Sequence, residues 1–192
     1  MRKYLCLLTM VLFAGVAAYA QDTSNKLDVY AGYSYVRESP STLGFNGFNL
    51  HGGNAAVTYK TKNWLGLVGD FGGYHAARIA GTSVSANEFT YMGGPRVSHS
   101  YNSGERGGFT PYAQVLFGLA HTSANLLGTS GSQNAFAMSL GGGVDTKISD
   151  RVSWRAAQVE YLPTRFRELS GPSSSRRTQN DLRVSTGLVF HF

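Results

Sequence analysis

The chain alternates between apolar and polar positions along much of its length, with a period of two residues. The alternation is clearest in the final stretch, 179–192, whose even positions are Leu182, Val184, Thr186, Leu188, Phe190 and Phe192. The odd positions of that stretch are Asp181, Arg183, Ser185, Gly187, Val189 and His191. A period of two predicts a β-strand whose faces meet different surroundings. The apolar face packs on a core in a soluble domain and faces lipid in a transmembrane barrel.

Seven earlier stretches show the same alternation, which brings the number of expected strands to eight. They are residues 26–38, 50–60, 64–74, 87–98, 109–121, 134–148 and 152–162. The stretch 152–162 changes parity in its middle. A β-bulge near Ala156 and Ala157 would reconcile its two halves.

The connections between these stretches alternate in length. Residues 39–49, 75–86, 122–133 and 164–178 form long polar connections, whereas 61–63 and 149–151 are short; 99–108 is the exception, being longer than the other two. Long loops on one side and short turns on the other, with an even number of strands, are typical of outer-membrane barrels. We therefore predict an all-β fold, an eight-stranded antiparallel up-and-down transmembrane β-barrel with both termini in the periplasm.

The first 20 residues predict a secretory signal peptide. Arg2 and Lys3 precede an apolar run, and Ala18 and Ala20 form a small-x-small cleavage motif before Gln21. The run is too short for a membrane-spanning helix. Residues 21–192 are then a single outer-membrane β-barrel domain. Cys6, the one cysteine of the chain, falls in the leader, so an exported domain without disulfides is expected.

Composition agrees with a barrel and argues against nucleic acid. The chain has 24 Gly, 11 Tyr and 11 Phe, a mixture favoured by barrels with short turns and aromatic belts. It is mildly basic, yet no run of basic residues exceeds Arg176-Arg177. These two arginines lie in the expected fourth long loop. They are our candidates for contact with anionic lipopolysaccharide.

Four motifs resemble the small eight-stranded outer-membrane β-barrel family, of the OmpA-domain and OmpX-like kind. They are Y-A-G-Y-S-Y at 30–35, F-T-P-Y-A-Q-V-L-F-G-L-A-H at 109–121, L-G-G-G-V-D at 140–145 and the terminal F-H-F. The resemblance covers nearly all of residues 21–192. It implies location in the cell outer membrane among lipid and lipopolysaccharide. It also implies that the barrel-assembly machinery reads the last strand, with Leu188, Phe190 and Phe192 as its signal.

Charged residues occupy positions that the alternation assigns to the barrel interior. Asp70, Arg96, Asp145 and Arg183 have inward parity, and Arg155 and Glu160 join them if the bulge is present. Charges in a narrow interior persist only when paired. Because Asp70 is on the neighbouring stretch, we expect it to be the first partner to test for Arg96, with Asp145 as the alternative. Eight strands leave room only for side chains, which favours a salt-bridged plug over an ion path.

Catalytic, cofactor and metal sites are not indicated. The five histidines, His51, His75, His99, His121 and His191, lack metal-ligand spacing. Gly141-Gly142-Gly143 is not followed by the Lys-Ser/Thr of a phosphate loop. We expect a non-enzymatic barrel with a structural or surface-interaction role through its extracellular loops. The alternatives are a narrow pore, or a lipid A-modifying enzyme for which His75, His121 and Ser123 are formal candidates.

Overall fold

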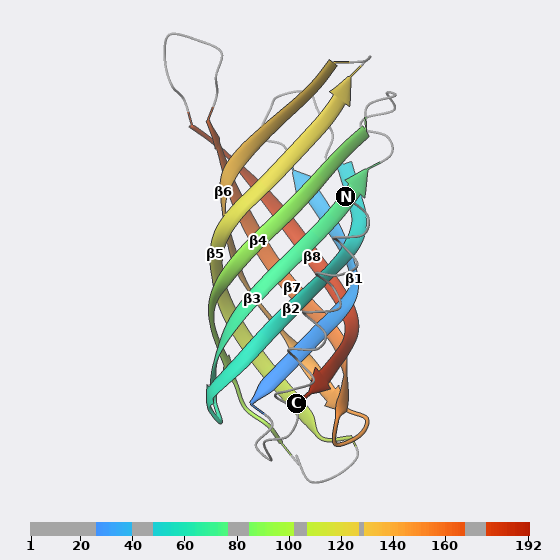
Figure 1. Ribbon diagram of the computed structural model, residues 1–192, viewed down its shortest axis with the longest axis vertical. Helices are drawn as coiled ribbons and strands as arrows, with labels where there is room; N and C mark the ends of the chain where they lie inside the picture. The colour runs from blue at the N-terminus through green and yellow to red at the C-terminus, as the bar shows by residue number, and fades with distance from the viewer. Residues whose placement is uncertain (1–25, 40–47, 77–84, 102–106, 127–128, 168–175) are drawn as a thin grey trace, which may run out of the picture.

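The computed structural model is one closed barrel of eight antiparallel strands, in which each strand pairs with its neighbours in sequence (Figure 1). It describes residues 26–39, 48–76, 85–101, 107–126, 129–167 and 176–192. The predicted signal peptide, residues 1–20, lies outside them. The strands are β1 (Leu27–Ser39), β2 (Phe48–Lys62), β3 (Leu65–Ala76), β4 (Ser85–Ser98), β5 (Phe109–Leu126), β6 (Thr129–Lys147), β7 (Val152–Arg167) and β8 (Arg176–His191).

The first and last strands close the barrel. β1 pairs antiparallel with β8, so that Val29 is opposite Phe190 and Ser34 is opposite Ser185. At the lower end of Figure 1, the backbone N–H groups of Leu27 and Phe192 donate to each other's carbonyls at 3.0 and 2.8 Å. The chain ends are therefore joined at the end that also has the short β2–β3 and β6–β7 turns. The eight-stranded antiparallel barrel predicted from the sequence is confirmed.

Two expected loops are shorter than predicted, because the strands continue through polar sequence. β5 and β6 pair as far as Leu126 and Thr129, so most of 122–133 is a β-hairpin rather than a loop. β7 and β8 pair as far as Arg167 and Arg176. Arg176 and Arg177 thus lie in β8, not in the fourth loop. Backbone hydrogen bonds hold paired strands together. Polar side chains therefore do not end the pairing where the strands extend beyond the membrane.

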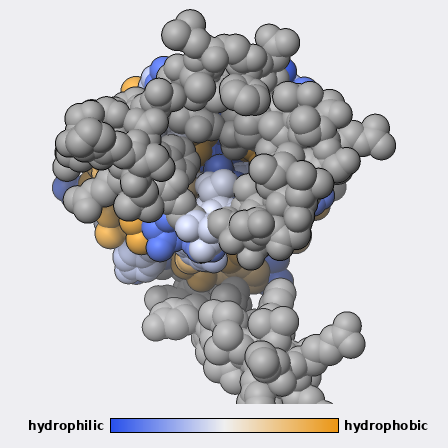
Figure 2. Space-filling model, turned by 90° about the horizontal axis from the view of Figure 1, so that it is seen from above, coloured by the Kyte–Doolittle hydropathy of each residue, from blue (hydrophilic) through white to orange (hydrophobic). Residues whose placement is uncertain are grey.

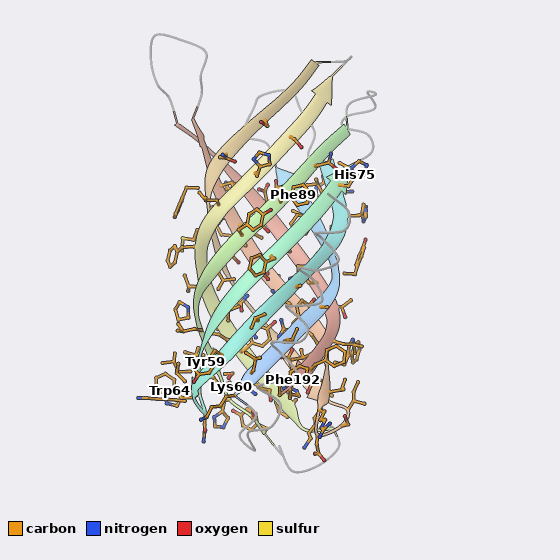
Figure 3. The ribbon with its side chains drawn as sticks, viewed as in Figure 1. Tyr59, Lys60, Trp64, His75, Phe89 and Phe192 are labelled. Atoms are coloured by element: carbon orange, nitrogen blue, oxygen red, sulfur yellow. The ribbon has the colours of Figure 1, made fainter. Side chains whose placement is uncertain are left out.

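Burial alternates along the strands as the sequence predicts. Along β3 the residues alternate between buried and more exposed at every step from Leu65 to Ala76. Large apolar side chains face outward, among them Tyr33, Leu67, Phe71, Tyr91, Phe117, Leu119, Phe136, Leu140, Trp154 and Tyr161. Tyr59, Trp64 and Phe192 lie toward the lower end, while His75 and Phe89 lie toward the upper end (Figure 3). Such an apolar outer surface suits lipid contact.

The expected bulge is present in β7. Asp145 of β6 is opposite Arg155, but its neighbour Val144 is opposite Ala157, so Ala156 is an additional residue. The β7–β8 register shifts between Arg155 and Gln158 as well. The bulge places Ser153 and Arg155 on the same inner face as Gln158, Glu160 and Leu162. It reconciles the two halves of β7.

Glycines on the inner wall make room for tyrosines inside the barrel. A Cβ on Gly72 would collide with the hydroxyl of Tyr74, and a Cβ on Gly143 would lie 2.7 Å from the hydroxyl of Tyr112. Both tyrosines are buried. The small residues therefore let two hydroxyl-bearing rings reach the polar groups of the interior.

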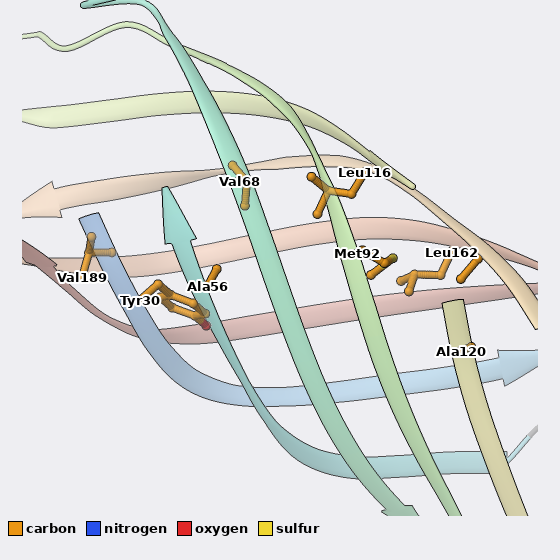
Figure 4. Packing of buried hydrophobic residues seen from close by; sticks show 9 residues of the cluster. Tyr30, Ala56, Val68, Met92, Leu116, Ala120, Leu162 and Val189 are labelled. Carbon is orange, nitrogen blue, oxygen red and sulfur yellow. The ribbon is translucent and has the colours of Figure 1, made fainter. Parts of the chain in front are cut away.

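Apolar residues occupy another part of the interior. One buried cluster draws on β1 to β8 and is seen in Figure 4; it consists of Tyr30, Ala56, Val68, Met92, Leu116, Ala120, Ala137, Leu162 and Val189. A second one, near the upper strand ends, consists of Val36, Leu50, Tyr74 and Ala76. Seen from the loop end, hydrophobic residues show on the flank and more hydrophilic ones toward the middle (Figure 2). Within the described ranges, no helix has the length and apolar character needed to span a bilayer.

Deletion of Ala156 tests the bulge. Without it, one half of β7 must turn its inward residues to lipid, and a single charged side chain there costs about 2–4 kcal/mol. We expect little heat-modifiable, folded barrel from this variant on gel electrophoresis. Deletion of Ser173, between β7 and β8, is the control and should fold normally. Equal folding of both variants would contradict the role given to the bulge.

Candidate functional site

A fully buried arginine lies at the centre of the polar interior. Arg183 on β8 donates from Nε to Oε2 of Glu160 at 2.6 Å, and from Nη1 to Oδ1 of Asp70 at 2.8 Å. The same Nη1 donates to the hydroxyl of Tyr74 at 2.7 Å. The side chains of Arg183 and Glu160 are 0% exposed, and that of Asp70 is 1% exposed. One arginine thus holds two carboxylates, from β3 and β7, across the barrel.

A second ion pair lies nearer the lower end. Arg155 donates from Nε and Nη2 to the two oxygens of Asp145 at 2.7 and 3.0 Å, in the bidentate geometry that gives strong pairs. Its guanidinium carbon lies 4.1 Å from the ring centre of Tyr30 and 4.6 Å from that of Tyr112. The two rings therefore hold Arg155 in place within the lumen.

Arg96 does not pair with Asp70, so that expectation is wrong. It donates from Nε and Nη2 to Oε1 of Gln114 at 2.8 and 2.6 Å, and lies over the ring of Tyr112 at 4.2 Å. Opposite Arg96 on β3 is Gly66, four residues before Asp70. At about 3.3 Å per residue, the two side chains start roughly 13 Å apart along the strand.

Neutral side chains join the ion pairs into one network, and the sequence did not single them out. Gln114 donates to Oε1 of Glu160 at 2.8 Å, and Gln158 donates to Oε2 of the same carboxylate at 2.6 Å. Gln158 also accepts from Arg155 and from Tyr112, at 2.8 and 2.7 Å. Their inward parity was visible in the sequence, but amides give no charge signal. The network unites all six interior charges predicted from the sequence, Asp70, Arg96, Asp145, Arg155, Glu160 and Arg183.

Below this network the barrel opens into a cavity of about 680 Å³, which we call the lower vestibule. Lower ends of all eight strands line it, as shown by Asp28, Lys60, Gly66, Ser98, Thr110, Lys147, Ser153 and His191. Arg96, Tyr112 and Asp145 line its inner part. It lies within the usual size range of small-molecule sites.

Four side chains from four strands form a cluster on the vestibule wall. His191 on β8 places Nδ1 2.7 Å from Oδ1 of Asp28 on β1, and Nε2 2.8 Å from Oγ of Ser153 on β7. Lys60 on β2 lies 2.8 Å from the same oxygen of Asp28. This cluster could not be predicted from the sequence, because it depends on how β8 pairs with both β1 and β7. Inward parity was the one available signal.

The residues predicted to act in assembly lie on the outer face of β8. Leu188 and Phe190 are 42% and 39% exposed. Phe192 follows the strand and lies at the lower end of the barrel (Figure 3). β8 is the strand at which the barrel closes. Its recognition during assembly stays a prediction. The side chains of Arg176 and Arg177 lie outside the described part of the chain.

The formal enzyme candidates near the upper end bond to asparagines. Nδ1 of His75 lies 2.8 Å from Oδ1 of Asn87, and Nδ1 of His121 lies 2.6 Å from Oδ1 of Asn134. For neither histidine does the described structure show a hydrogen bond to Ser123. Within the described ranges, no group of three or more His, Cys, Asp or Glu side chains is placed to hold a metal ion.

Comparison with known proteins gives a consistent result. The model of the family described as "Outer membrane protein beta-barrel domain" matches residues 6–192. No curated protein matches the chain. Among solved structures, Neisserial surface protein A (NspA) is similar with a TM-score of 0.61 and 15% identity, covering 88% of this chain and 98% of that one.

Two further structures are similar to the same extent. Ail, the attachment invasion locus protein of Yersinia pestis, gives a TM-score of 0.58 at 15% identity, over 86% of this chain and 97% of Ail. OprG from Pseudomonas aeruginosa gives 0.58 at 11% identity, over 86% and 95%. At these identities the likeness shows the fold alone.

Double-mutant cycles on Asp70 test the interior pairing. Asp70→Ala and Arg183→Ala should couple by about 1–3 kcal/mol in urea unfolding in lipid, because the two groups share a buried ion pair. The cycle of Asp70→Ala with Arg96→Ala is the matched control and should give less than about 0.5 kcal/mol. A larger coupling to Arg96 than to Arg183 would contradict the network.

Deletion of Phe192 tests the assembly signal. The variant should be exported, yet should give less folded barrel in the outer membrane, because the closing strand loses its terminal aromatic. Phe71→Ala removes a lipid-facing aromatic from the middle of β3 and is the control. Heat-modifiability of membrane fractions measures both, and equal losses would mean that the terminal position has no special role.

Proposed function

The chain belongs to the outer membrane protein β-barrel domain family, and from this premise we propose that it acts at the cell surface through its loop-bearing end. It is a β-barrel protein of the outer membrane. The proposed role is structural or surface-interacting: the barrel anchors the upper strand ends and loops, which contact ligands or neighbouring molecules outside the cell. The interior, in this proposal, carries no solute flow.

The filled interior is the observation that supports this proposal most strongly. Arg183, Glu160 and Asp70 connect β8, β7 and β3 across the lumen, and Arg155 and Tyr112 occupy the space beneath them. The apolar cluster containing Val36 and Leu50 lies above. Moving an ion through would require breaking buried ion pairs, at several kcal/mol for each stranded charge. In this proposal, the surface role is therefore carried by the outside of the barrel.

The relatives support a surface role without assigning a ligand. One of the similar structures is a Neisserial surface protein, and another is an attachment invasion locus protein. Ail has also been solved in complex with the heparin analogue sucrose octasulfate; that structure has a TM-score of 0.56 and 14% identity to this chain. For this chain we propose anionic surface molecules, lipopolysaccharide first, with Arg176 and Arg177 as contacts at the upper end of β8.

Single-channel recording tests the closed interior. We expect the wild-type barrel in planar bilayers to show no steady conductance, whereas Arg183→Ala combined with Asp70→Ala and Glu160→Ala should admit ions because it removes the central plug. The triple variant also serves as a positive control for insertion into the bilayer. A large, steady, ion-selective conductance from the wild type would replace the proposal with the narrow-pore alternative.

Binding of immobilised lipopolysaccharide tests the surface role of the two arginines. Near an anionic surface each contributes about 1 kcal/mol, so Arg176→Gln with Arg177→Gln should weaken binding by roughly thirtyfold. Lys26→Gln with Lys62→Gln removes the same charge at the opposite end and is the matched control. Equal weakening in both variants would mean that net charge, and not the upper end of β8, determines binding.

A further inference from the structure

Three side chains on the vestibule wall have the connectivity of an activated serine. Ser153 Oγ lies 2.8 Å from Nε2 of His191, and Nδ1 of His191 lies 2.7 Å from Oδ1 of Asp28. The strand register explains the meeting, because Asp28 is directly opposite His191 on β1 and β8, and Ser153 is opposite Val189, two residues earlier on β8. Nucleophile, base and orienting carboxylate within hydrogen-bond reach are the geometric signature of nucleophilic catalysis.

For a neutral imidazole, the ionised carboxylate beside it decides which ring nitrogen carries the proton. An ionised carboxylate only accepts, so Nδ1 of neutral His191 must donate to Asp28. Nε2 then presents its lone pair to Ser153, whose hydroxyl donates to it. Lys60, 2.8 Å from the same oxygen of Asp28, favours the ionised carboxylate. The imidazole is therefore held in the tautomer that can take a proton from Ser153.

The three residues line the lower vestibule, where a small substrate has room to bind. Arg96 also lines it, and its hydrogen bonds use Nε and Nη2 on the neutral Gln114 rather than a carboxylate. The other charged side chains near the wall already form ion pairs, Lys60 with Asp28, Lys147 with Asp150 and Arg155 with Asp145. Arg96 is 5% exposed and so is a desolvated cation suited to an anionic substrate group.

We propose that Ser153, His191 and Asp28 form a hydrolytic site, open to the periplasmic side, for small esters that carry a carboxylate or phosphate. Ser153 and His191 are its catalytic residues, Asp28 is a positioning residue, and Arg96 binds the anionic group of the substrate. This goes beyond the proposed surface role and is independent of it, because it concerns the opposite end of the barrel.

The reaction uses water as its one co-reactant. Ser153 Oγ attacks the ester carbonyl while its proton passes to Nε2 of His191. The C–O bond to the alcohol breaks, His191 gives that proton to the leaving oxygen, and an acyl-serine remains. A water molecule in the vestibule then attacks the acyl carbon and loses a proton to His191. The acid leaves, and His191 returns the proton to Ser153.

Phosphonylation is the first test. The purified, folded barrel is treated with a fluorophosphonate, which a serine activated by histidine attacks with loss of fluoride. Intact-mass and peptide analysis should find one phosphonyl group on Ser153. Ser153→Ala and His191→Gln should remain unlabelled, whereas Ser98→Ala, which removes another serine of the vestibule wall, should be labelled like the wild type. Folding of each variant is checked by heat-modifiability.

The same experiment separates catalysis from a structural role. If the cluster merely ties β7, β8 and β1 together, the variants will alter unfolding, but folded wild type will stay unlabelled at Ser153. That result overturns the proposal, even if His191→Gln fails to fold. Labelling of Ser153 that persists in folded His191→Gln also overturns it, because the serine is then reactive without its base.

Ester hydrolysis tests the substrate class. Mono-4-nitrophenyl succinate carries a free carboxylate and 4-nitrophenyl acetate does not. Ser153→Ala should lower kcat at least a hundredfold for both, and Asp28→Asn should lower kcat more than it changes KM. Arg96→Gln should raise KM at least tenfold for the succinate ester and by a much smaller factor for the acetate ester, which lacks the anionic group that Arg96 binds. An equal effect on the two esters would overturn the role of Arg96 in recognition.

Discussion

The structure depends on neutralising charge inside a narrow barrel. Arg183 is fully buried between Asp70 and Glu160, and each of the three would be costly in this position without the others. Eight strands enclose a space that side chains can fill, and the central network of this barrel consists of three arginines, three carboxylates and the amides that join them. Two other features contribute to this neutralisation, because they bring hydroxyls and charges to the common network. They are the glycines beside Tyr74 and Tyr112 and the bulge at Ala156.

Much of the fold was predictable, because parity along a strand is a local property. The alternation in 179–192 placed Arg183 inside and Phe190 outside, and the broken parity of 152–162 indicated the bulge. The partner of each interior charge was not predictable in the same way. Arg96 and Asp70 share the inner face of adjacent strands, but their separation along the axis depends on register, and four residues of offset separate them. Loop length was overestimated for a related reason, since the β5–β6 and β7–β8 ladders continue beyond the apolar residues.

The cluster on the vestibule wall was not predictable from the sequence. Asp28, Ser153 and His191 lie at the start of β1, the start of β7 and the end of β8, and only barrel closure brings them together. Their sequence spacing carries no signal, unlike a metal-binding or nucleophile motif. The two ends of the molecule thus differ in chemistry. The upper end carries the long β5–β6 and β7–β8 hairpins, whereas the lower end forms a polar cavity beneath the buried network.

Proton exchange at the guanidinium of Arg183 tests the central claim, a sealed and charge-neutral interior, most directly. In arginine-labelled protein in lipid, NMR can compare the exchange of its Nε and Nη protons with those of Arg151, which lies in the exposed β6–β7 turn. A sealed network predicts that Arg183 exchanges with water at least a hundredfold more slowly than Arg151 and that its signal stays resolved. Exchange at the same rate in both residues would show that water reaches Arg183, and would contradict the closed interior on which the proposed surface role rests.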